Sequence, residues 1–113
     1  MANGLRIIPE ALRVRESSGF NGAYQALGTP LSYACCLVKI VNNSNVLVTI
    51  SWDGITDHDV VPGNSFALYD VCSDAGSQRG LYVAQGTQFW VKGSAGVLNT
   101  GSVYLVAFHT SEY

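Results

Sequence analysis

Apolar and polar residues alternate along short segments of the chain, with glycine, proline or asparagine between the segments. Alternation with a period of two is the pattern of a strand with one buried face. The clearest example spans residues 46–52, and its apolar face, which we expect to enter the core, consists of Val46, Val48, Ile50 and Trp52. Convincing helical periodicity is absent from the sequence. The predicted strands span residues 23–27, 35–42, 46–52, 58–61, 65–71, 81–84, 88–92 and 102–109.

Short strands at a spacing of roughly ten residues, joined by glycine-rich turns, are typical of two sheets packed face to face. We therefore predict an all-β fold, a β-sandwich or jelly roll of about eight short antiparallel strands. Pro62 and Gly63 predict a type II turn, because proline fixes φ and glycine allows a positive φ at the next position. Residues 35–41 and 103–108 are apolar on both faces. They are either central strands covered on each side or strands with one face in a subunit contact.

The first 22 residues form an extended segment that is either an N-terminal arm or an edge strand, ahead of a β-sandwich domain at residues 23–113. Pro9 interrupts this segment, and Ser17-Ser18-Gly19 separates it from the later strands. As an arm it would dock on a neighbouring subunit, because burying each apolar side chain is worth about 1.5–3 kcal/mol. The residues that we predict to contribute to an interface are Leu5, Ile7, Ile8, Leu12 and Val14.

Charged residues are scarce, at 12%, whereas 48% of the residues are apolar. A surface with few charges is easier to bury against another protein, because fewer ions lose their hydration. The net charge of -2 and a pI near 5.4 argue against direct nucleic-acid binding, which needs clustered basic residues. No signal sequence or bilayer-spanning apolar segment precedes or interrupts the strands. We therefore expect a soluble protein, made in the cytoplasm and without a membrane contact.

Three cysteines give an odd number, and two of them, Cys35 and Cys36, are adjacent. Adjacent residues of a strand point to opposite faces, so the sequence reveals no disulfide framework, and we expect Cys35, Cys36 and Cys72 to be reduced. The sequence at Asn42 matches a glycosylation sequon, but without a secretion signal it does not indicate glycosylation.

The sequence contains only weak signals of a catalytic or metal-binding site. Residues 53–59 contain three aspartates and His58 around a turn, a set of oxygen ligands that calcium favours, but the EF-hand spacing is absent. We interpret the loop as structural, because aspartate commonly bonds turn amides. The second histidine, His109, has no metal-ligand spacing relative to His58 or the cysteines. No nucleophile motif or phosphate-binding loop is present either. We therefore predict no catalytic residue, no metal ligand and no cofactor.

Aromatic residues are the remaining candidates for a binding surface. Trp90 alternates out of phase with Phe89 and Val91, which places it on the opposite face of a strand. Aromatic side chains on a β-sandwich can stack on a sugar ring, and the same residues are favoured in protein interfaces. We favour the interface and include Trp90 among its predicted residues.

Several segments together resemble small structural virion proteins of tailed bacteriophages, over most of the chain. These segments are ANGLRIIPE at residues 2–10, ISWDGITDH at 50–58, VPGN at 61–64, LYD at 68–70, QGT at 85–87, VK at 91–92 and GSVY at 101–104. The resemblance implies a non-enzymatic β-sandwich subunit present in many copies, as a capsid decoration or cement protein or a head, neck or tail accessory protein. Its partners would be other virion proteins and further copies of itself, and its location the virion, after synthesis in the host cytoplasm.

A second hypothesis stays open beside the first. The chain could be a carbohydrate-binding, lectin-like module, in which Trp90 and the loop at residues 53–59 carry the binding.

Overall fold

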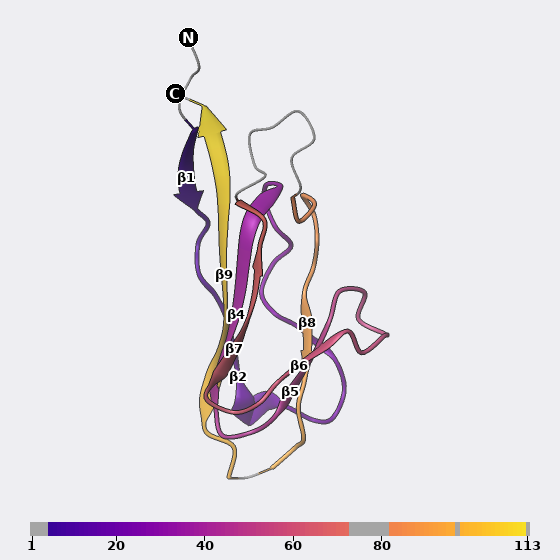
Figure 1. Cartoon of the computed structure of the whole chain (residues 1–113). Helices are drawn as coiled ribbons and strands as arrows, with labels where there is room; N and C mark the ends of the chain where they lie inside the picture. Colours follow the sequence, from indigo (N-terminus) through magenta and orange to yellow (C-terminus); the bar gives the residue numbers. More distant parts are fainter. Residues whose placement is uncertain (1–4, 73–81, 97, 113) are drawn as a thin grey trace.

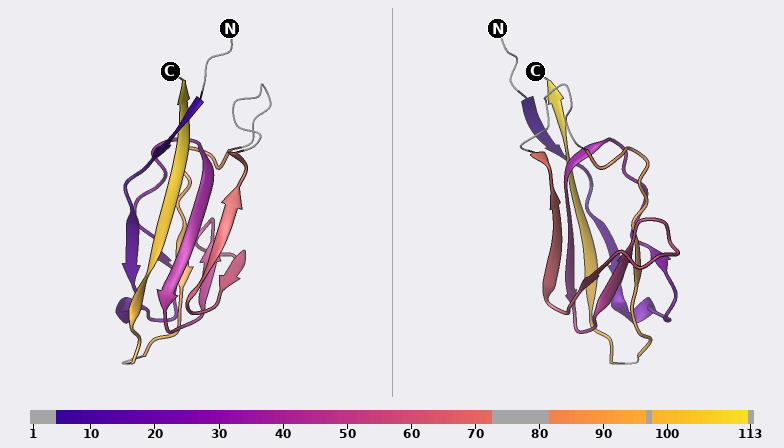
Figure 2. Two further views of the ribbon diagram at one scale, coloured as in Figure 1. Left: turned by 60° about the vertical axis from the view of Figure 1, so that its left-hand side comes forward. Right: turned by 45° about the vertical axis from the view of Figure 1, so that its right-hand side comes forward.

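The computed structural model describes residues 5–72, 82–96 and 98–112, and it confirms the all-β prediction (Figure 1). These residues form nine strands in two antiparallel sheets, and a 3-10 turn, η1 (Ser17–Gly19), follows the second strand. The five-stranded sheet has the order β1-β9-β4-β7, with β2 also paired to β9, and the four-stranded sheet has the order β3-β8-β5-β6. Figure 2 shows the two sheets as separate layers. The strands are β1 (Leu5–Pro9), β2 (Arg13–Glu16), β3 (Gln25–Ala26), β4 (Cys35–Ser44), β5 (Val48–Ser51), β6 (Asp59–Val61), β7 (Ser65–Asp70), β8 (Trp90–Lys92) and β9 (Gly101–Glu112).

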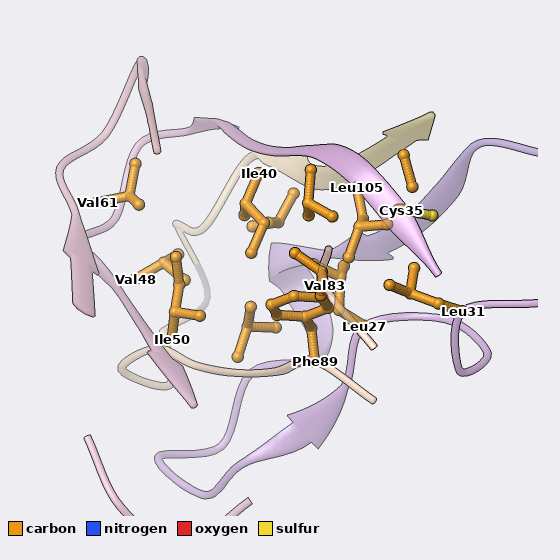
Figure 3. Close-up of a cluster of buried hydrophobic side chains, with 14 of the residues drawn as sticks. Leu27, Leu31, Cys35, Ile40, Val48, Ile50, Val61, Val83, Phe89 and Leu105 are labelled. Atoms are coloured by element: carbon orange, nitrogen blue, oxygen red, sulfur yellow. The ribbon is translucent and has the colours of Figure 1, made fainter. Parts of the chain in front are cut away.

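The core fills the space between the two sheets (Figure 3). Ile40 and Leu105 enter it from the five-stranded sheet, and Ile50 and Phe89 enter it from the opposite side. The face predicted for residues 46–52 is confirmed, because Val48 and Ile50 are fully buried and both flanking apolar residues pack against the cluster. Two long neighbours, β4 and β9, supply most of one wall and thereby fix the positions of all the strands around them.

The predicted strand at residues 81–84 is wrong in its described part. Val83 forms an isolated β-bridge with Cys35, and residue 81 lies outside the described residues. The backbone bonds of Val83 and Cys35 are reciprocal, at 2.7 and 2.8 Å, so Val83 is buried by this contact without a regular strand around it.

In the single chain the N-terminal segment contains two strands, β1 and β2, that pair with β9. Residues of β1 pair with β9 from Ile8↔His109 to Pro9↔Phe108, and β2 pairs with the same edge of β9 further along. Between them, Glu10 and Arg13 form a buried ion pair with 2.8 Å between Oε1 and Nη2. The Arg13 guanidinium also donates to the carbonyl oxygens of Thr29 and Pro30, and these bonds hold the segment against the second layer.

The turn at residues 61–64 differs from the predicted type II turn. Asn64, and not Gly63, has the positive φ, at 59°. Gly63 is needed for a different reason, because a Cβ there would lie 2.8 Å from the carbonyl oxygen of Ser44. The left-handed conformation therefore falls one residue later, on asparagine, which tolerates it better than most residues.

The expectation that all three cysteines are reduced is wrong. Cys36 and Cys72 form a disulfide, and Cys35 is a buried free thiol. Cys36 lies at the start of β4 and Cys72 follows the end of β7, so antiparallel pairing of these two strands brings the cysteines together. Cys35 enters the core instead.

Candidate interaction surface

The outward face of the five-stranded sheet carries a continuous layer of apolar side chains. Antiparallel partners share a face, so the register across β2, β9, β4 and β7 places Val14, Tyr104, Val41 and Phe66 in one outward row. Twelve outward positions in the same register form one block, of which ten are apolar or aromatic, and the polar residues Glu16, Asn43, Ser102 and Thr110 lie outward at its two ends. We call these twelve positions the outer apolar face: Ile7, Pro9, Val14, Leu37, Lys39, Val41, Phe66, Leu68, Asp70, Tyr104, Val106 and Phe108.

Several of these apolar side chains are exposed rather than packed. Phe66 is 59% exposed, and Ile7, Val14 and Leu68 are each about half exposed. A hollow of about 400 Å³ lies among Leu37, Phe66, Leu68 and their neighbours, and its lining is mostly apolar. Isolated exposed apolar residues are ordinary, but a contiguous set on one sheet face marks a contact surface.

The outward face of the four-stranded sheet is different. Its register places Thr49, Ser51 and Lys92 on that face, beside Trp90 and Val60. Ser51 is buried because the following loop folds over it, and its hydroxyl accepts hydrogen bonds from the backbone N–H groups of the next turn. One face of the sandwich therefore mixes polar with apolar residues and is partly covered by its own loop, whereas the central rows of the other are mainly apolar and uncovered in the described structure.

Trp90 lies under this loop, and its ring packs closely against Gly54, where a Cβ would lie 3.0 Å from the indole. Nearby, Asp57 accepts hydrogen bonds from the Tyr24 hydroxyl and from the Lys92 ammonium, and Lys92 also lies 4.6 Å from the Tyr24 ring centroid. Burial and the Asp57 carboxylate raise the pKa of Tyr24, while the hydrogen bonds from Tyr24 and Lys92 lower the pKa of Asp57. These polar groups bind one another, which disfavours this cluster as a sugar site.

Carboxylates of the loop at residues 53–59 accept hydrogen bonds within the chain, as the structural interpretation predicts for its turn amides. Asp53 accepts hydrogen bonds from the backbone N–H groups of Ile55 and Thr56, both at 2.8 Å, and these bonds hold the pKa of Asp53 well below its usual range. Asp59 accepts a bond from the Tyr69 hydroxyl at 2.7 Å. In the chain as described, no three histidine, cysteine or acidic side chains are grouped so that they could hold a metal ion.

A buried polar cluster anchors the N-terminal segment next to Cys35. The Glu10 carboxylate accepts bonds from Arg13, from the backbone of Ser32 and Tyr33, and from the Cys35 thiol. Burial opposes ionisation of Glu10, but these bonds outweigh it and lower its pKa. Burial, together with the Glu10 carboxylate, raises the pKa of the Cys35 thiol to about 12. The groups of this cluster form hydrogen bonds with one another and with the backbone, so we interpret the cluster as structural.

The two histidines are not brought together. His58 follows β5 and accepts a hydrogen bond from the backbone of Trp52, whereas His109 lies in β9 and stacks on Tyr33 with 4.1 Å between ring centroids. The side chain of His109 is buried, and among the described groups its Nδ1 has no hydrogen-bond partner.

The structure places the interface residues that were predicted from the sequence on different surfaces. Ile7 and Val14 belong to the outer apolar face, and Leu12 is exposed in the connection between β1 and β2. Ile8 points to the opposite side of β1 and is half-buried; Leu5 is in β1, and its side chain is not described. Trp90 lies on the other sheet.

Sequence reasoning did not single out the centre of the face, which consists of Leu37, Phe66, Leu68, Val106 and Phe108. The sequence did contain a signal for this face, because the segments that form β4 and β9 are apolar on both faces. The same double-sided pattern also occurs at residues 65–69, where Phe66 and Leu68 alternate with Ala67 and Tyr69.

Comparison of the chain with protein-family models, with curated proteins and with solved structures finds no match. Within the described ranges, no helix has the length and apolar character that crossing a membrane would require. The arguments about function therefore rest on the residues and their geometry.

Proposed function

We propose that the chain is a non-enzymatic structural subunit of a bacteriophage virion, as a capsid decoration or cement protein or a head, neck or tail accessory protein. It acts through protein–protein contacts made by the outer apolar face. The observation that carries the proposal is the asymmetry of the sandwich, with ten apolar or aromatic residues in adjoining rows of one sheet face and a smaller, mixed and partly loop-covered opposite face.

Burial of the exposed side chains of this face would make a substantial contribution to the free energy of association. Full burial of one large apolar side chain is worth about 1.5–3 kcal/mol, so burying the remaining half of Ile7, Val14, Phe66 and Leu68 contributes about 1 kcal/mol each. Assembly contacts repeated over many copies do not need high affinity for each copy, because linked contacts add through effective concentration.

The virion setting rests on the sequence resemblance, and the disulfide between Cys36 and Cys72 is compatible with it. Disulfides persist in oxidising surroundings and are rare in the reducing cytosol. A subunit made in the cytoplasm and released in a particle would meet oxidising conditions after release. Its partners would be other virion proteins, and its location the particle.

The proposal is tested on particles purified by density gradient from cells that express the chain in its natural genetic setting. Quantitative mass spectrometry of these particles should find the chain in many copies per particle. Its absence from purified particles would overturn the virion proposal.

A pair of matched variants tests the role of the face. Phe66 is 59% exposed on the edge strand of the outer apolar face, and Val60 is 50% exposed on the edge strand of the other sheet. Phe66→Lys should reduce incorporation into particles at least about tenfold, because burying an unpaired ammonium costs several kcal/mol. Val60→Lys should incorporate normally. Equal incorporation of both variants, with unchanged melting temperatures, would show that the face does not make the contact.

A further inference from the structure

The centre of the outer apolar face contains one unpaired positive charge. Lys39 lies in β4 between Val106 on one neighbouring strand and Leu68 on the other. Its side chain is half-buried, and among the described residues its ammonium has neither a hydrogen bond nor an ion pair. A partner that covers the face with apolar groups alone would remove this charge from water without compensation, which is costly. The partner surface must therefore bring a carboxylate opposite Lys39.

The chain carries such a carboxylate on the same face. Asp70 pairs with Leu37 in the row next to the Lys39–Leu68 pair, so Asp70 is one strand and one row away from Lys39. Its side chain is exposed and accepts a hydrogen bond from the backbone of Cys72, and it forms no ion pair with the described lysines or arginines. A positive and a negative group thus lie in adjacent rows of one surface.

We infer that the occupant of the outer apolar face is a second copy of this chain, packed sheet against sheet about a two-fold axis. The axis crosses the strands between the Lys39–Leu68 row and the Leu37–Asp70 row. Rotation about it exchanges the two rows while each strand keeps its position, so Lys39 faces Leu37 of the second copy and lies beside Asp70 of the second copy. Symmetry repeats the contact, which gives two ion pairs for each dimer.

The size of the face is compatible with this packing. Strands lie about 4.8 Å apart and outward residues recur about every 6.7 Å, so twelve outward positions span roughly 400 Å² of sheet plane. Accessible area exceeds this plane because the side chains project, and two such faces together approach the roughly 1,000 Å² of a specific contact. Aligned packing of two sheets about 10 Å apart also places a lysine within reach of a carboxylate on the opposite sheet.

This inference rests on the proposed function, because it names the first partner of the same face. Sedimentation velocity and light scattering of the purified full chain, over a range of protein concentrations at physiological salt, test it by a charge exchange. The wild-type chain should dimerise. Lys39→Asp and Asp70→Lys should each weaken dimerisation about tenfold or more, because like charges then meet in both contacts. The double variant should restore dimerisation to within about threefold, and Val60→Lys should dimerise like the wild type.

Each outcome decides a separate point. A wild-type chain that stays monomeric overturns the inference, and the proposed function survives if Phe66→Lys still lowers incorporation into particles. A dimer that is insensitive to either single charge change also overturns it. If the double variant is no better than the single variants, the two charges do not meet across a two-fold axis. Melting temperatures of dilute, monomeric samples separate these association effects from changes in the stability of the single chain.

Discussion

Loss of the disulfide between Cys36 and Cys72 should destabilise the chain strongly. The bond closes a loop with a sequence separation of 36 residues. Loop-closure entropy then gives about 4 kcal/mol at 25 °C, because the crosslink restricts the unfolded chain. It also ties the end of the edge strand β7 to β4, next to the backbone bond from Val71 to Cys36, so its removal should allow β7 to fray first.

Urea unfolding of the wild type and of a Cys36→Ala/Cys72→Ala variant measures this contribution. The free energy of unfolding of a small domain falls by about 1–3 kcal/mol per molar urea. The midpoint of urea unfolding should therefore fall by about 2 M. The melting temperature should fall by about 15–20 °C. The control is a reducing agent, which should produce the same shift in the wild type and no shift in the double variant.

The result that would refute this reasoning is specific. If alkylation of the denatured, unreduced wild type labels three thiols, the disulfide does not form in the protein. If one thiol is labelled but reduction leaves the urea midpoint unchanged, the bond forms without restricting the unfolded chain as calculated.

Three further predictions concern Glu10, Cys35 and Gly101. Because its pKa is lowered in the folded chain, ionised Glu10 stabilises the fold above the unfolded pKa of about 4.3, and this stability is lost as pH falls through the folded value. Glu10→Gln should therefore cost about 2 kcal/mol at pH 7, with a difference in urea midpoint that narrows below about pH 4; a constant difference would contradict this. Cys35, buried and with its pKa raised to about 12, should resist a thiol reagent at pH 8 in the native chain and react after unfolding, so rapid native labelling would contradict its environment. Gly101→Ala should lower stability by at least about 2 kcal/mol in urea unfolding, because φ is +86° there and the new Cβ would meet the Asn43 carbonyl oxygen; an unchanged midpoint would contradict this.

Local alternation was sufficient to predict the strands that line the core. Residues 46–52 contain β5, whose apolar side chains Val48 and Ile50 enter the core, whereas residues 65–71 contain β7, in which half-buried side chains alternate with exposed ones. Alternation failed at residues 81–84, since Val83 is buried by a single bridge to Cys35 and no ladder continues from it.

Pairing could not be predicted, because it depends on register between distant segments. The disulfide requires the particular alignment of β4 with β7 that puts Leu37 opposite Asp70. The same is true of the N-terminal segment, whose two strands follow one edge of β9 around a break at Glu10. A single sequence does not contain this information, and cysteine parity pointed away from a bond.

The outer apolar face could be predicted only in part. Two-sided apolar strands indicate that both faces of a sheet avoid water, but they do not say which face is covered within the chain. The structure resolves this point, because Ile40 and Leu105 enter the core while Lys39 and Val106, their neighbours in sequence, point outward. The charge at Lys39 then becomes informative, since its position at the centre of the face was invisible in the sequence.

The central claim, that assembly covers the outer apolar face, is tested most directly by hydroxyl-radical footprinting of side chains. Oxidation is quantified by mass spectrometry in the assembled particle and in the released single chain. We predict that Phe66, Leu68 and Phe108 are protected several-fold in the assembled state, whereas Val60 and Trp90 on the other sheet change little. Protection of Val60 and Trp90, with Phe66 and Leu68 oxidised equally in both states, would contradict the account.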